Sequence, residues 1–157
     1  MAAVKNTISL ILSKPRLRDS IKITVINYES TARLIFKKEV PSLDLLNKID
    51  FKSGGTNFEL PLTMAYDTIL ETKNEFDMFT IGFLTDGIAP YPTKIIDKIN
   101  ADKEKIKSKI TFNCILFGKE SSNLETISKN LKGNYTKVIN FEELKNSFKE
   151  IINIGFK

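Results

Sequence analysis

Residues 79–87, with the sequence FTIGFLTDG, are the stretch that decides the fold of this chain. If this run is a strand, bulky apolar residues lie on both of its faces. The run stops at an acidic residue followed by glycine. A short apolar run of this kind is typical of a strand buried on both faces of a parallel sheet. Ligands bind at the carboxyl edge of open α/β sheets, so we expect a binding site at Thr85-Asp86-Gly87.

Helical and strand-like segments alternate on both sides of this stretch. The first two strands are separated only by the turn residues Asn27 to Ser30, so they must be antiparallel. The order predicts an α/β fold in one domain spanning residues 1–157, with helices on both faces of a mostly parallel sheet that has one antiparallel edge strand. The predicted strands are 20–28, 31–36, 79–85, 111–117 and 134–139, and the predicted helices are 2–13, 41–49, 62–70, 92–107, 121–131 and 141–154.

The composition excludes several classes of protein. Histidine is absent, which removes His-based triads, most zinc sites and the commonest general base. The single cysteine, Cys114, cannot form an internal disulfide and is interpreted as a small buried hydrophobe. With no signal peptide in the sequence, this cysteine usage favours a cytoplasmic (intracellular) location.

The charge pattern argues against nucleic acid and membranes as partners. The chain carries 24 Lys and Arg against 19 Asp and Glu, a net charge of +5, but the two signs are interleaved, as expected of solvated helix faces. No RNA-binding aromatic motif or zinc-finger spacing is present. No apolar stretch approaches the roughly 18 residues that a membrane helix needs.

A second polar feature, the loop Gly54-Gly55-Thr56-Asn57, could converge on Asp86. A hydroxyl and a carboxylate are hard oxygen ligands that suit Mg²⁺, Mn²⁺ or Ca²⁺. Thr56 also fits a helix N-cap with Glu59 as its capping-box partner, although Pro61 argues for a helix that begins after Asn57 and leaves Thr56 free. Asp86 equally fits an ordinary Asp-Gly turn after a strand, so both roles stay open for each residue.

These segments resemble the von Willebrand factor type A (vWA) family. Residues 53–58 with Pro61, Leu62 and Ala65 look like its G-G-T-N-x-x-x-x-L segment, and residues 83–87 look like its L-x-T-D-G strand end. Residues 19–36 resemble its second strand and hairpin, with Tyr28 at the aromatic position and Ala32 at the alanine. The resemblance implies a Rossmann-like three-layer fold and a protein–protein interaction module.

The resemblance also implies an incomplete metal-ion-dependent adhesion site (MIDAS). Thr56 and Asp86 match two of the family's metal ligands, but the D-x-S-x-S motif on the central first strand has no counterpart, so the chain resembles an N-terminally truncated family member. Binding of Mg²⁺ or Mn²⁺ is then expected to be weak or absent. The implied partner is another protein, through an acidic residue at the metal. Its remaining contacts would be Gly54, Gly55, Asn57 and Gly87.

A missing central strand would leave the strands at 20–28 and 79–85 facing each other with unpaired backbone groups. Three resolutions are open. The upstream part was lost, a second chain supplies the strand (a strand-swapped homodimer is one form of this), or the two strands close up and pair directly.

Two other functions compete with metal-dependent binding, and neither is excluded by the residues. One is a Mg²⁺-dependent phosphoryl-transfer hydrolase with Asp86 as nucleophile. Such enzymes usually carry a second Asp two residues on, where this chain has Ile88, so we do not expect an enzyme. The other is a scaffold domain that binds its partner without metal.

Overall fold

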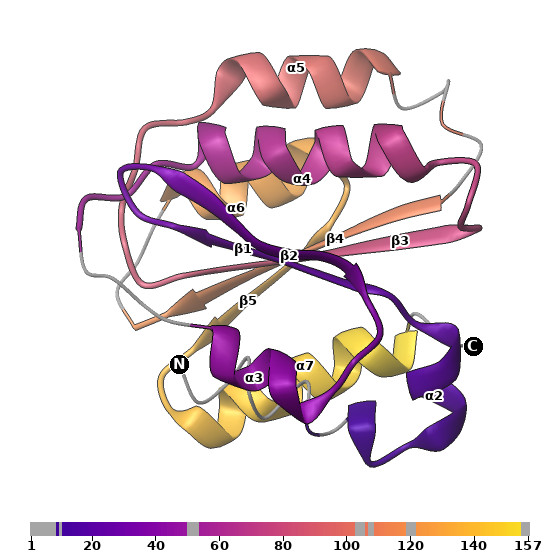
Figure 1. The fold of residues 1–157 in the computed structure, drawn as a ribbon. Helices are drawn as coiled ribbons and strands as arrows, with labels where there is room; N and C mark the ends of the chain where they lie inside the picture. Colours follow the sequence, from indigo (N-terminus) through magenta and orange to yellow (C-terminus); the bar gives the residue numbers. More distant parts are fainter. Residues whose placement is uncertain are drawn as a thin grey trace.

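The computed structural model describes residues 9, 11–49, 54–102, 106, 109–118 and 122–154. Helices and strands alternate along most of the chain, and the strands lie in a central layer between two layers of helices (Figure 1). In chain order the elements are α2 (Pro15–Ser20), β1 (Ile23–Tyr28), β2 (Ala32–Glu39), α3 (Leu43–Lys48), α4 (Glu59–Thr72), β3 (Met78–Thr85), α5 (Thr93–Asp102), β4 (Lys109–Phe117), α6 (Ser122–Asn130), β5 (Asn134–Val138) and α7 (Phe141–Ile154).

The strands form two separate sheets. β1 and β2 pair antiparallel, while β3, β4 and β5 form a parallel sheet in that order. The predicted antiparallel hairpin and the predicted parallel strands are therefore confirmed. Among the described residues no ladder joins β1 to β3, so these two strands have not closed up and paired directly.

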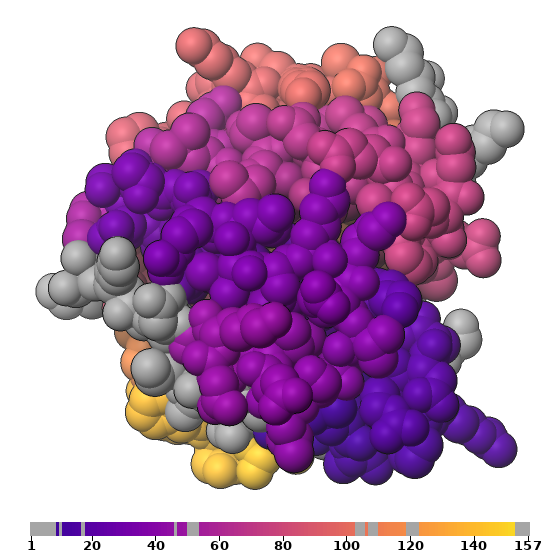
Figure 2. Space-filling model, viewed as in Figure 1, coloured from indigo at the N-terminus to yellow at the C-terminus, as the bar shows by residue number. Residues whose placement is uncertain are grey.

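Each layer of helices covers its face of the strands with the apolar stripe that the sequence pattern predicts. α4, α5 and α6 lie on one face, where Tyr66, Ile99 and Ile127 are buried against β3 and β4. On the other face α7 packs against β4 and β5 through Leu144, and α3 packs against the hairpin through Leu45. Seen from the hairpin side, residues of β1, β2, α3 and α4 form one surface (Figure 2).

The start of the chain differs from the prediction. Pro15 lies just beyond the helix predicted over residues 2–13, and in the structure it opens a further helix, α2, because proline fits the first position of a helix, where no N–H is needed. The strand expected from Ser20 therefore begins only at Ile23. The helix predicted over residues 2–13 lies mostly outside the described residues, of which Ser9, Ile11 and Leu12 are helical.

The end of the chain agrees with the prediction. α7 spans the predicted residues 141–154, and its N-terminus carries a capping box. The side chain of Asn140 accepts a hydrogen bond from the backbone N–H of Glu143 at 2.9 Å, and the Glu143 carboxylate accepts one from the N–H of Ile139 at 2.9 Å.

No helix in the described part of the chain is long and apolar enough to span a membrane.

Candidate functional site

The two polar loops predicted to converge are in contact at the carboxyl edge of the strands. A Cβ atom added to Gly87 would overlap the hydroxyl of Thr56 and would lie 3.2 Å from its Cβ atom. Glycine at position 87 therefore lets the loop after β3 approach Thr56 closely. Thr56 and Gly87 are half-buried, whereas Asp86 is exposed beside them.

The turn after β1 holds the glycine loop in place from the other side. The backbone N–H of Asn57 donates to the carbonyl of Glu29 at 2.8 Å. The Glu29 carboxylate lies so close to Gly54 that a Cβ atom there would overlap it, and a Cβ atom at Gly55 would lie 3.7 Å from Ser30. The site is therefore assembled from three loops, which follow β1, precede α4 and follow β3.

Asn57, and not Thr56, caps the N-terminus of helix α4. The side-chain oxygen of Asn57 accepts a hydrogen bond from the N–H of Leu60 at 3.1 Å. α4 starts at Glu59, so Pro61 stands in its first turn, where the missing N–H costs no intrahelical bond. The sequence argument from Pro61 is confirmed.

Glu59 has a role that the sequence pattern did not reveal. Its carboxylate accepts a hydrogen bond from the backbone N–H of Ile95 at 3.0 Å, in the first turn of α5. A carboxylate there satisfies an otherwise unpaired N–H and favours the positive end of the helix dipole. No local spacing could signal this contact, because the two residues lie 36 positions apart.

The end of β3 is held by hydroxyl groups. The N–H of Gly87 donates to the Thr85 hydroxyl at 3.0 Å, and the hydroxyl of Tyr28 donates to the backbone carbonyl of Leu84 at 2.7 Å. The Tyr28 ring also stacks on Phe83, with centroids 5.1 Å apart. Burial raises the pKa of Tyr28 above its ordinary value, so its hydroxyl stays a neutral donor.

The metal ligands predicted at this edge are Thr56 and Asp86. Thr56 and Asp86 offer a hydroxyl and a carboxylate, whereas Mg²⁺ usually needs near-octahedral coordination. Within the described ranges no group of three or more Asp, Glu, Cys or His is placed to hold a metal ion. Among the described residues, the chemistry available at this edge is hydrogen bonding and the carboxylates of Asp86 and Glu29.

Apolar side chains are also exposed at the carboxyl edge of the strands. Ile88 follows β3, Ile139 follows β5, and Leu60 lies in the first turn of α4; they are 68%, 69% and 44% exposed. Phe141, at the start of α7, is 61% exposed, and its ring lies 5.5 Å from that of Phe117 at the end of β4. All of them belong to segments at the carboxyl edge, which we call the carboxyl-edge surface.

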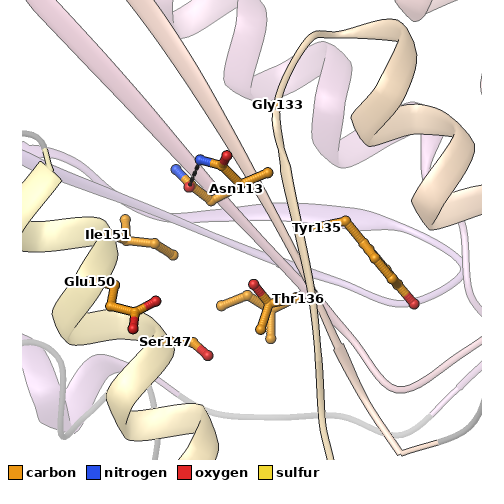
Figure 3. Close-up of a pocket in the computed structure, with 9 residues that line it drawn as sticks. Asn113, Gly133, Tyr135, Thr136, Ser147, Glu150 and Ile151 are labelled. Carbon is orange, nitrogen blue, oxygen red and sulfur yellow. Dashed lines mark hydrogen bonds between the residues drawn. The ribbon is translucent and has the colours of Figure 1, made fainter.

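A separate hollow of about 440 Å³ lies between β4, β5 and α7 (Figure 3). The amide of Asn134 donates to the side-chain oxygen of Asn113 at 3.0 Å, and Thr136, Ser147 and Glu150 contribute further polar groups. Asn134 is the first residue of β5, so this hollow begins at the opposite end of that strand from Ile139. It was not foreseen from the sequence and shares no residue with the carboxyl-edge surface.

Comparison with solved structures identifies the architecture. The chain superimposes on a von Willebrand factor type A protein from Catenulispora acidiphila with a TM-score of 0.67, at 16% identity over 96% of this chain. The fold is vWA-like. Proximal thread matrix protein 1 from the mussel byssus is also similar, with a TM-score of 0.62 and 16% identity over 98% of this chain.

The vWA-like chain spans only part of these relatives, 36% of the first protein and 40% of the second. No protein-family model and no curated protein sequence matches it. The vWA-like fold expected from the two motifs is thus supported by structure, while the metal ligation of Thr56 and Asp86 stays a prediction.

Proposed function

We propose that this chain is a protein-interaction module that binds its partner at the carboxyl-edge surface. The observation that carries the proposal is the exposure of Ile88, Ile139 and Phe141 at the same edge of the sheet as the contact between Thr56 and Gly87. Interface cores are enriched in large apolar and aromatic side chains and carry a polar rim. Asp86 and the loop at Gly54 and Gly55 would supply that rim.

The partner is proposed to bind without a firmly held metal ion. Millimolar Mg²⁺ or Mn²⁺ is expected to shift the melting temperature by less than about 1 °C, because weak binding contributes little free energy at such concentrations. Thermal-shift titrations of the wild type and Asp86→Ala measure this. A larger shift in the wild type that is absent from the variant would instead assign Asp86 a metal-binding role.

Photo-crosslinking tests the proposed surface directly. A photoreactive amino acid at Ile88 is expected to crosslink a partner protein in cells, because Ile88 lies in the proposed interface. The matched control is Met78, which is 43% exposed at the other end of the same strand, β3. The adduct at Ile88 should be lost on adding Asp86→Arg and should persist in a chelator. Equal adducts from both positions would contradict the proposal.

A further inference from the structure

The hollow between β4, β5 and α7 interrupts an otherwise apolar contact between the sheet and this helix. Near the carboxyl ends of the two strands, Phe117 lies opposite Val138, and both belong to the apolar cluster around Leu144 of α7. Near the other end of β5, the same face of the sheet carries Asn113 opposite Asn134. Strands of a parallel sheet are normally apolar beneath a helix, so this pair of amides departs from the expected pattern.

Asn113 is deeply buried for a residue with a polar side chain. It is 5% exposed in the middle of β4, between Phe112 and Cys114. An amide that is removed from water needs hydrogen-bonding partners, and its side-chain oxygen accepts one bond from the amide of Asn134 at 3.0 Å. A carbonyl oxygen has two lone pairs, so the oxygen of Asn113 can accept a second bond from a molecule bound in the hollow.

Helix α7 contributes further acceptor oxygens. Ser147, Glu150 and Ile151 all line the hollow, because residues three and four apart lie on one side of a helix. Figure 3 shows Ser147 and Glu150 on the side of α7 that faces Thr136. The Ser147 hydroxyl donates to the backbone carbonyl of Glu143 at 3.1 Å, which leaves its oxygen free to accept. In the described part of the chain, neither the Glu150 carboxylate nor the Thr136 hydroxyl has a hydrogen-bond or ion-pair partner.

The charge of the lining selects the class of molecule that fits. None of the described lining residues is Lys or Arg, and Glu150 supplies the one negative charge. A cation with N–H donors would find its counter-charge there, whereas an anion would be repelled. Ile115 and Ile151 add apolar surface to the same hollow. A guanidinium group suits both features, because it is planar and weakly hydrated, carries several N–H donors, and can bond a carboxylate in a bidentate arrangement.

We propose that this hollow binds a guanidinium group on a short aliphatic chain. The guanidinium pairs with the Glu150 carboxylate and donates further bonds to the Thr136 hydroxyl and the side-chain oxygen of Asn113. The aliphatic chain packs on Ile115 and Ile151. The volume of about 440 Å³ lies within the range of sites that bind small molecules, roughly 300–1,000 Å³. The site shares no residue with the carboxyl-edge surface, so it does not rest on the function proposed there.

The experiment titrates the full chain with n-butylguanidinium and follows backbone amide shifts by NMR. Saturable shifts are expected at Asn134, Thr136 and Ser147, with a dissociation constant on the order of 1 mM for so small a probe. The uncharged isostere n-butylurea should bind at least about tenfold more weakly, because it lacks the charge-assisted bond. The more strongly hydrated n-butylammonium should also bind more weakly. No saturable shifts, shifts at other residues, or equal binding of either analogue would overturn the proposal.

Two substitutions on α7 form a matched pair. Glu150→Gln removes the charge from the hollow and is expected to weaken binding of n-butylguanidinium at least about tenfold. Glu142→Gln makes the same change on the same helix, at a side chain that is 80% exposed and does not line the hollow, so its affinity should be unchanged. Both side chains are exposed, so both variants should keep the wild-type melting temperature. Equal affinities of the two variants would contradict the pairing with Glu150.

Thr136→Val tests the strand side of the hollow, because valine keeps the shape of the side chain and removes its hydroxyl. Binding is expected to weaken about two- to tenfold, and an unchanged affinity would contradict the proposed contact. The source of the group is tested with arginine blocked at both ends as N-acetyl and N-methylamide. Tighter binding of blocked arginine than of n-butylguanidinium would support the site with an arginine side chain of another protein as its ligand. Exclusion of blocked arginine would support the site with a free small molecule.

Discussion

Replacing Phe58 with alanine is expected to lower the free energy of unfolding by about 3–5 kcal/mol, the cost of removing a buried aromatic side chain. Phe58 is 1% exposed, and its ring meets Phe83 edge-on with centroids 5.3 Å apart. Because Phe83 in turn stacks on Tyr28, the truncation also removes support from the contact that links the two sheets.

Thermal unfolding measures this effect, with an expected fall in melting temperature of roughly 6–20 °C for a chain of this size. Leu60→Ala is the matched control, because Leu60 lies two residues away and is 44% exposed. Its effect should stay within about 0.5 kcal/mol. A similar loss in both variants would show that Phe58 is not the anchor between α4 and the sheets.

Alkaline conditions are expected to unfold the chain, with Cys114 making a large contribution. Burial raises the pKa of the Cys114 thiol from 9.0 to about 12. The folded chain therefore favours the neutral thiol more strongly than the unfolded chain does. The contribution of Cys114 to the free energy of unfolding is complete below pH 9 and is lost as the pH rises through 12. Ionisation of this thiol in the unfolded chain is therefore expected to lower the free energy of unfolding by an amount on the order of a few kcal/mol.

Tyr66 also lowers the free energy of unfolding as the pH rises, starting from its ordinary pKa of 10.0. Burial, followed by the nearby carboxylates of Asp102 and Asp67, raises its pKa from 10.0 to about 12. Denaturant unfolding between pH 8 and pH 11 measures the combined slope, and Cys114→Ala should make it shallower by removing the thiol. An unchanged slope in Cys114→Ala, or rapid thiol labelling of the native chain at pH 8, would contradict the burial of Cys114.

The elements themselves were largely predictable. The apolar periods of α4, α5, α6 and α7 and the β-branched composition of β1 are local signals, and the capping box at Asn140 is a spacing of three residues. The α2 helix was missed because Pro15 marks the end of one helix and the start of another equally well.

At the candidate site, the sequence by itself determined which polar residues stand at the ends of which segments, and so placed Thr56 and Asp86 at one edge. Only the tertiary structure decided what each side chain contacts: Thr56 against Gly87, Glu59 at the start of α5, and Tyr28 across to Leu84. The physical reason is the distance along the chain over which each signal acts. Periodicity, propensity and capping act within a few residues, whereas these contacts join residues about 30 to 56 positions apart, whose meeting depends on how the two sheets and their helices pack.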